Sequence, residues 1–177
     1  KSIPFGTILN LNINGENNTG LIGYNNGEIK AITVDTEYVK GKNYVGGIAG
    51  QNTKSISTII LKNDNTESGV YNITGEENVG GIIGYNYYGN GKTLVFSGNI
   101  SGVYNVGGIN GNQSGGEITG VYTKGEIIAT NLNFYRGVGY AGGGTTKAII
   151  VNKDVTVNGE TRTSEHASNW DGKDATE

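Results

Sequence analysis

Apolar and polar residues alternate over short stretches of this chain, and Gly or Asn interrupts the alternation every few residues. Four of these stretches are rich in Val, Ile, Thr and Tyr: residues 30–41, 57–64, 93–102 and 119–130. Alternation and β-branched residues are typical of strands, and no stretch has the apolar stripe and cap of a helix. The pattern therefore predicts an all-β protein, with a further strand at 7–13 and a strand pair within 145–157.

A glycine motif precedes these strands and recurs about every thirty residues, as in repeat proteins. Its first and second glycines are Gly20 and Gly23, Gly47 and Gly50, Gly81 and Gly84, Gly108 and Gly111, and Gly139 and Gly142. A valine stands two residues before the first glycine in three copies: Val45, Val79 and Val106. An amide stands two residues after the second glycine in four copies: Asn25, Asn52, Asn86 and Gln113.

Short strands in such a repeat predict a parallel β-solenoid with coils of about thirty residues, because each coil buries its apolar row only by stacking on the next. Small Gly-x-x-Gly turns would let successive coils approach to the strand spacing of about 4.8 Å. Ile48 and Ile82 would then line the core, and the corner amides would form a hydrogen-bonded ladder. A β-sandwich is the alternative fold, but it leaves the repeated amide unexplained.

The repeat pattern divides the chain into three parts. Residues 1–16 are predicted to form an incoming coil or cap, and residues 17–144 form the repeat body. Residues 145–177 are predicted to hold the last strand pair and, from 159, a polar linker or cap. Because the chain starts at Lys1 without a signal peptide, we expect it to be a piece of a longer product with flanking domains.

The string Val-Gly-Gly-Ile-x-Gly-x-Asn, followed by a Thr- and Val-rich segment, resembles the GLUG motif, a short bacterial repeat. The resemblance covers residues 17–144 and is closest at 46–52, 80–86 and 107–111. Thr19 replaces the leading glycine of the first copy, and Val138 takes that position in the last. The family includes surface adhesin-like proteins and non-catalytic regions of IgA-specific zinc metallopeptidases. The resemblance therefore implies a β-helical, extracellular, bacterial protein in which the motif is architectural.

Composition excludes several classes of protein. The chain has 32 Gly but only 1 Pro, so a collagen-like or proline-rich linker is excluded. Charged residues are 16% of the chain, without a basic stripe, which argues against nucleic-acid binding and a polybasic membrane anchor. The absence of Cys excludes disulfides, thiolate zinc sites and thiol catalysis. No apolar stretch approaches the length of a membrane span.

Candidate chemical groups are sparse, and no catalytic residue, metal site or cofactor is predicted. His166 is the only histidine and lacks the second histidine of a zinc-binding helix. The carboxylate pairs Asp35 with Glu37 and Glu76 with Glu77 lack the basic cluster of a uronate lyase, so turn and surface roles explain them. Residues 169–177 hold oxygen donors but match no calcium loop, and a polar linker is the simpler interpretation.

Tyrosines are the candidates for recognition. Tyr24, Tyr85, Tyr87 and Tyr88 lie in or just after the repeat turns. Tyrosine offers amphipathic contact area and stacks on sugar faces, so these residues are predicted to bind a host glycan or surface protein. Stacking between coils would also place tyrosines there, and the sequence leaves both interpretations open.

Three functions follow from these observations. The first is a bacterial surface adhesin or rigid stalk that contacts a host ligand in infection. The second is an accessory domain that positions substrate for a large secreted zinc metallopeptidase, such as an IgA protease. The third and weakest is a β-helix enzyme acting on polysaccharides. The sequence does not separate the first two, because both would use the same scaffold.

Overall fold

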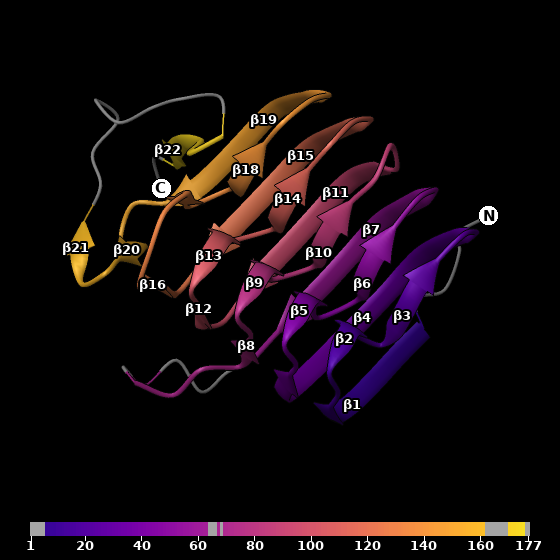
Figure 1. The fold of residues 1–177 in the computed structure, drawn as a ribbon, viewed down its shortest axis with the longest axis horizontal. Helices are drawn as coiled ribbons and strands as arrows, with labels where there is room; N and C mark the ends of the chain where they lie inside the picture. The colour runs from indigo at the N-terminus through magenta and orange to yellow at the C-terminus, as the bar shows by residue number, and fades with distance from the viewer. Residues whose placement is uncertain (1–5, 64–66, 68, 162–169, 176–177) are drawn as a thin grey trace.

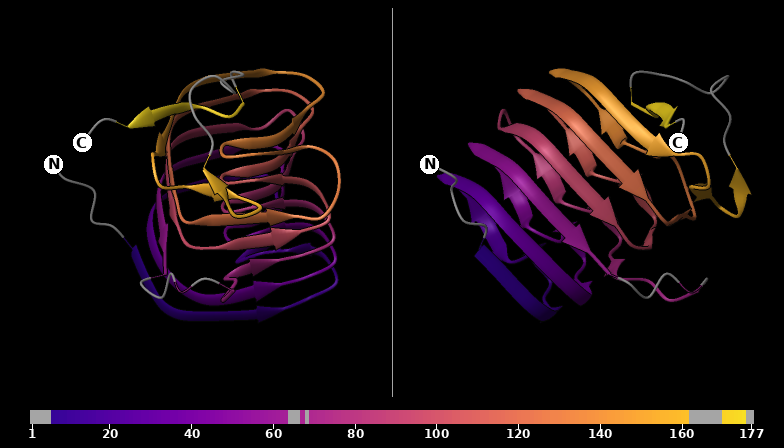
Figure 2. Two further views of the ribbon diagram at one scale, coloured as in Figure 1. Left: turned by 90° about the vertical axis from the view of Figure 1, so that its left-hand side faces the viewer. Right: turned by 180° about the vertical axis from the view of Figure 1, so that it is seen from behind.

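A computed structural model describes residues 6–63, 67, 69–161 and 170–175. Within these ranges the chain is all-β, without a helix, and its parallel sheets stack as a β-solenoid of about 6 turns. Figure 1 shows the coils following one another from the first, indigo strands to the last, yellow ones, and the end view in Figure 2 shows them stacked. The predicted β-solenoid is confirmed, and the alternative β-sandwich is wrong.

In the part of the chain that the structure describes, three sheets run along the stack. Sheet A has 12 strands: β1 (Gly6–Asn14), β4 (Glu28–Lys40), β7 (Ser55–Lys62), β8 (Ile73–Thr74), β11 (Asn90–Ser97), β12 (Ile100–Gly102), β15 (Glu117–Lys124), β16 (Glu126–Ala129), β19 (Thr145–Asn152), β20 (Thr156–Val157), β21 (Glu160–Thr161) and β22 (Lys173–Ala175). Sheet B holds β2 (Asn17–Thr19), β5 (Asn43–Gly46), β9 (Glu77–Gly80), β13 (Tyr104–Gly107) and β17 (Phe134–Tyr135). Sheet C holds β3 (Ile22–Asn25), β6 (Ala49–Asn52), β10 (Ile83–Asn86), β14 (Asn110–Gln113) and β18 (Val138–Ala141).

Each coil passes through sheet B, sheet C and then the two halves of sheet A. In the first coil, the single strand β4 runs through both halves. In the next coil two separate strands, β7 and β8, take its place, and both pair with β4. Pairing between coils is parallel, and β20 with β21 forms an antiparallel pair at the end. The four predicted β stretches all fall in sheet A: 30–41 on β4, 57–64 on β7 up to its end at Lys62, 93–102 on β11 and β12, and 119–130 on β15 and β16.

A left-handed residue shifts the alternation inside each long strand of sheet A. Thr58 has a φ of 55°, and its neighbours Ile56, Ile59 and Leu61 are fully buried while Ile60 is exposed. Positive φ angles also occur at the same level of other coils, for example at Ala31, Thr93 and Gly120. Because β4, β7, β11 and β15 each have such a residue at the same level, the pairing between these strands stays one to one, and the segments on both sides of the left-handed residue face the core.

Sheets B and C pack against each other with their backbones in contact. A β-carbon built on Gly46 would lie 2.4 Å from the carbonyl oxygen of Ala49 and 2.5 Å from the nitrogen of Gly84. One built on Gly50 would lie 2.6 Å from the nitrogen of Thr19. No side chain fits between the two sheets at these positions. Glycine therefore lies on both sides of the contact, except in the last coil, where Tyr135 takes the sheet B position and pairs with Gly107.

The bend between these sheets points toward sheet A. Gly47 and Ile48 form the bend between β5 and β6, and a β-carbon on Gly47 would lie 2.3 Å from Leu61 Cδ1. We call the two short strands with their bend the wedge of each coil. The prediction of a Gly-x-x-Gly turn was therefore wrong in part, because the second glycine, Gly50, lies inside a strand of sheet C.

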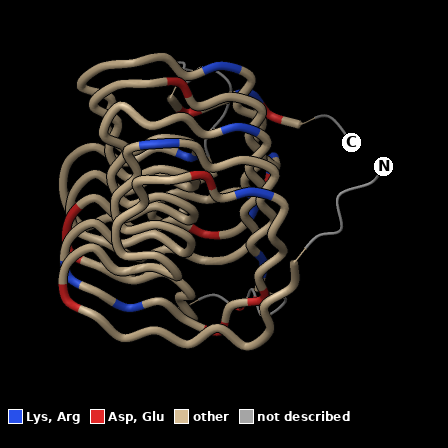
Figure 3. The backbone as a smooth tube through the Cα atoms, turned by 90° about the vertical axis from the view of Figure 1, so that its right-hand side faces the viewer, with Lys and Arg blue, Asp and Glu red and all other residues tan. Residues whose placement is uncertain are grey.

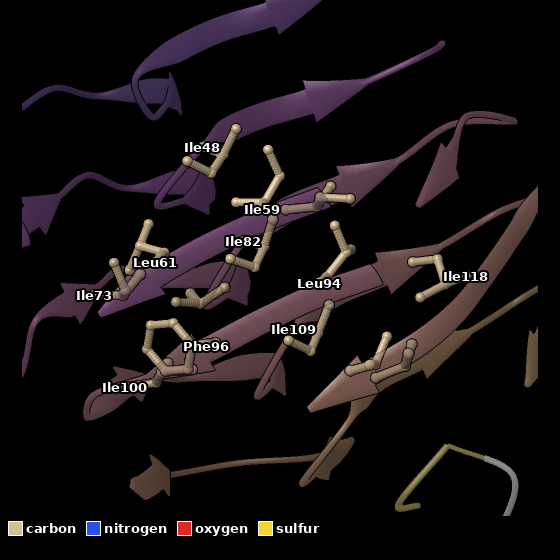
Figure 4. Close-up of a cluster of buried hydrophobic side chains, with 14 of the residues drawn as sticks. Ile48, Ile59, Leu61, Ile73, Ile82, Leu94, Phe96, Ile100, Ile109 and Ile118 are labelled. Carbon is tan, nitrogen blue, oxygen red and sulfur yellow. The ribbon is translucent and has the colours of Figure 1, made fainter. Parts of the chain in front are cut away.

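The tips of the wedges build the core with sheet A. Ile48, Ile82 and Ile109 follow the first glycine of successive motifs and are fully buried. Figure 4 shows these isoleucines following one another along the stack beside Leu61 and Phe96 of sheet A. The predicted core column of Ile48 and Ile82 is confirmed, and full burial of each such side chain contributes about 1.5–3 kcal/mol.

The prediction that Gly139 is the first glycine of the last motif copy is wrong. Val138 pairs with Asn110 and Phe134 pairs with Val106, so Gly139 corresponds to the second glycine, Gly111, and Arg136 replaces the first. In the first copy Thr19 pairs with Val45, which places Gly20 opposite Gly46 and shortens the bend by one residue. Sequence spacing around glycines was ambiguous here, and the strand register decides it.

Arg136 closes the last coil together with the chain's C-terminal segment. Its side chain is fully buried, its Nε donates to Asp171 Oδ2 at 2.8 Å, and its Nη1 forms a second ion pair with Asp174. The Trp170 carbonyl accepts from the Val138 nitrogen at 2.9 Å, and β22 pairs with β19. Part of the segment predicted to be a polar linker is thus packed onto the solenoid, while His166 lies outside the described residues.

Asn110 breaks the apolar column of sheet C. It pairs with Ile83 on one side and Val138 on the other, is fully buried, and neither its Oδ1 nor its Nδ2 has a hydrogen-bond partner. An unpaired buried amide is destabilising because its hydration is lost without replacement. We therefore expect Asn110→Val to raise the free energy of unfolding by about 1–2 kcal/mol.

Urea unfolding followed by circular dichroism would measure this gain. Asn112→Val is the matched control, since Asn112 lies on the same strand but donates to Asn78 Oδ1 at 2.8 Å and should not gain stability. A lower midpoint for Asn110→Val would contradict the expectation and would indicate that an ordered water satisfies the amide.

Candidate functional site

The corner amides form a buried ladder, as the sequence predicted. Asn25 Nδ2 donates to Asn52 Oδ1 at 2.7 Å, and Asn52 Nδ2 donates to Asn86 Oδ1 at 2.8 Å. The ladder ends there, because Asn86 Nδ2 donates instead to the carbonyl of Gly89, at 2.7 Å. Gln113 does not continue it and donates to the carbonyls of Gly116 and Thr145.

The same asparagines also shape the turn from sheet C to sheet A. The Gly27 nitrogen donates to Asn25 Oδ1 at 3.1 Å, and Asn25 Nδ2 returns a bond to the Gly27 carbonyl. Asn52 makes the corresponding contacts with Lys54. Asparagine side chains favour such turns because they hydrogen-bond to the backbone two residues on. These amides therefore have a structural role.

Three of the predicted recognition tyrosines, Tyr85, Tyr87 and Tyr88, lie together near the wedge mouth, where sheets B and C reach the surface, and the fourth, Tyr24, lies apart. Tyr87 and Tyr88 are 47% and 66% exposed, and Tyr24 is 54% exposed. Tyr85 is only half-buried, and its hydroxyl lies 2.7 Å from Ser114 Oγ. Tyr24 is two coils away from Tyr85, with Gln51 between them in the sheet C register.

Four tyrosines form one continuous aromatic cluster. The Tyr44 and Tyr85 rings stack with centroids 5.3 Å apart, and Tyr85 and Tyr87 follow at 6.0 Å. Tyr87 and Tyr88 meet edge to face at 4.9 Å. We call Tyr44, Tyr85, Tyr87 and Tyr88 the tyrosine cluster. Tyr44 was missed in the sequence, because it lies 41 residues before Tyr85 and only the coil register brings them together.

A shallow groove adjoins the cluster at the turn from sheet C to sheet A. It has a volume of about 480 Å³ and is lined by residues of three successive turns: Asn26, Gly27, Glu28, Thr53, Lys54, Ser55, Tyr88 and Asn90. Amides, hydroxyls and one aromatic ring dominate this lining. Such a surface offers both stacking and hydrogen bonding to a polar ligand.

Ionisable groups with shifted pKa values lie outside this region. A hydrogen bond from Lys147 lowers the pKa of the Glu117 carboxyl on β15, and partial burial raises the pKa of the Tyr71 hydroxyl. Figure 3 shows that charged residues are scattered over the coils. Within the described ranges no three His, Asp or Glu residues are grouped to hold a metal, and no helix is suited to crossing a membrane.

The carboxylate pairs considered in the sequence stay on the surface. Asp35 and Glu37 flank the buried Thr36 on β4, and Glu76 and Glu77 are exposed where β9 begins. Neither pair lines the groove. The candidate site is therefore the tyrosine cluster with its adjoining groove, in which Glu28 and Lys54 are the charged lining residues.

Fold and site together define a β-solenoid module with a tyrosine-lined lateral face. No protein-family model, curated protein or solved structure matches this chain. The resemblance to the GLUG motif therefore stays a prediction.

Proposed function

We propose that this chain is a non-catalytic β-solenoid module that binds glycans, acting at the bacterial cell surface or after secretion. The observation that carries the proposal is the tyrosine cluster, in which two large rings, Tyr87 and Tyr88, stay 47% and 66% exposed beside a groove. Exposed aromatic rings that neighbouring rings hold in place can stack on sugar faces at little entropic cost.

The scaffold supports this role because it fixes the rings before a ligand arrives. The Tyr88 ring would lie within 2.6 Å of a β-carbon on Gly115, so glycine there lets the ring lie flat on the next coil. The nitrogen of Tyr87 donates to the Asn52 carbonyl at 2.8 Å. The same face would serve a surface adhesin or hold glycosylated substrate for a larger secreted peptidase.

Removal of the two exposed rings tests the proposal. We expect Tyr87→Ala with Tyr88→Ala to weaken binding to a responsive glycan on a glycan array by tenfold or more, since two stacking contacts are lost. Tyr85 is left intact, because its contacts with Tyr44 and Ser114 contribute to folding.

The matched control is Tyr122→Ala. Tyr122 is on β15, between the buried Val121 and Thr123, and so faces outward from sheet A. Its removal should leave the affinity unchanged. Absence of saturable binding by the unaltered chain, or equal binding by the double variant, would contradict a glycan-binding role for this face.

A further inference from the structure

Tyrosine and amide residues alternate along the outer side of sheet C. The strand register places Tyr24, Gln51, Tyr85, Asn112 and Tyr140 at the same level of five successive coils. Tyr24 and Tyr140, at the two ends of this column, are 54% and 40% exposed. Because parallel strands lie about 4.8 Å apart, neighbouring tyrosines of the column are roughly 9.6 Å apart.

A second column faces the first across the wedge mouth. It follows sheet B, where five residues in its strands or directly before β17 have left-handed φ angles of 50–62°: Asn18, Tyr44, Asn78, Asn105 and Asn133. Asn105 Nδ2 donates to Asn78 Oδ1, and Asn133 Nδ2 donates to Asn105 Oδ1, both at 2.9 Å. These bonds fix the amides along the stack.

Contacts across the mouth join the two columns into one surface. Asn112 Nδ2, on β14, donates to Asn78 Oδ1, on β9, at 2.8 Å. In the same way, the Tyr85 ring on β10 stacks on the Tyr44 ring on β5. Both contacts link a sheet B residue to the sheet C residue of the next coil. Asn78 is only 2% exposed, and its Oδ1 holds Asn105 and Asn112 in place. The surface is therefore a preorganised strip that runs along the solenoid axis over at least four coils.

The chemistry of the strip selects among polymers. None of its ten residues is charged, so it lacks the Lys and Arg that nucleic-acid phosphates require. It presents side chains and no unpaired strand edge, so β-strand addition of a peptide has no backbone partner here. Rings at a constant spacing match a neutral polymer that repeats a flat apolar face, and the half-buried Gln51 amide between Tyr24 and Tyr85 can bond to its hydroxyl groups.

The geometry points to a neutral linear polysaccharide that lies parallel to the solenoid axis and stacks on Tyr24, Tyr85 and Tyr140 in turn. This inference rests on the proposed glycan-binding function and adds the ligand's shape and direction. Binding energy is then distributed over alternate coils, so affinity rises with the length of the sugar chain until the chain reaches from Tyr24 to Tyr140.

The test measures affinity against chain length. Soluble cellulose derivatives, xylan, mannan and laminarin are the polymer probes, and the disaccharide-to-octasaccharide series of each bound polymer is then titrated by calorimetry. We expect affinity to rise at least tenfold from disaccharide to octasaccharide. Tyr24→Ala and Tyr140→Ala should each weaken octasaccharide binding by about tenfold. The matched control Tyr122→Ala, on β15 of sheet A, should leave octasaccharide binding unchanged.

The outcomes separate the axial strip from the glycan-binding function. Binding that is lost in the Tyr87 and Tyr88 variant but insensitive to chain length, Tyr24 and Tyr140 would overturn the axial strip and leave the glycan-binding function standing. If the folded chain binds none of the four polymers, the inference of an axial polysaccharide strip is wrong. The glycan array then tests the proposed glycan-binding function separately. Circular dichroism of each variant checks that its fold is retained.

Discussion

Gly84→Ala is expected to lower the free energy of unfolding by about 3 kcal/mol or more. The added β-carbon would lie 2.4 Å from the carbonyl carbon of Tyr44, 2.5 Å from the nitrogen of Val45 and 2.7 Å from the oxygen of Gly50. All three are backbone atoms of the preceding coil, which cannot move aside as a flexible side chain could. The two sheets of the wedge would have to separate, and the contact repeats in every coil.

Urea unfolding followed by far-ultraviolet circular dichroism measures this loss. Gly27→Ala is the control, since its β-carbon would have only Asn25 Oδ1 within reach, at 4.0 Å, and its φ is not left-handed. That variant should stay within about 0.5 kcal/mol of the unaltered chain. Equal stability of the two variants would mean that the backbone contact between sheets B and C is wrong.

Asp171→Ala is expected to destabilise the last coil by about 3 kcal/mol. Asp171 is fully buried, and its two oxygens accept from the nitrogen and the Nε of Arg136 at 3.0 and 2.8 Å. Its removal leaves a buried guanidinium with Asp174 as its remaining acidic partner. Without Asp171, the hydration that the Arg136 guanidinium loses on burial is only partly replaced. The C-terminal segment should therefore detach more often.

Amide hydrogen exchange at Val138 reports this detachment, because that N–H donates to the Trp170 carbonyl. The exchange rate should rise about a hundredfold if opening becomes easier by about 3 kcal/mol. Asp154→Ala removes an exposed ion pair with Lys153 and should leave the rate unchanged. Combining Asp171→Ala with Arg136→Met should restore part of the protection, because no buried charge remains. Unaltered exchange in Asp171→Ala would contradict a capping role for the ion pair.

The candidate site could be predicted only in part. Tyr87 and Tyr88 follow a repeat turn, and turns lie on the surface, so their exposure was accessible to sequence reasoning. Tyr85 stands beside them in the chain but is half-buried, since Tyr44 stacks on it from another coil. Tyr44 and Tyr140 carry no local signal, and the number of coils between two tyrosines depends on the register.

The sequence by itself determined the parallel solenoid and its amide ladder. Repetition made this possible, since identical residues at one position can bond to their copies only when coils stack in register, as Asn25, Asn52 and Asn86 do. Only the tertiary structure decided that sheets B and C pack backbone to backbone at Gly46 and Gly84. It also decided that Arg136 replaces a motif glycine in the last coil. Both depend on contacts between coils or with a distant segment, and a one-dimensional pattern does not record which backbone lies within van der Waals distance of another.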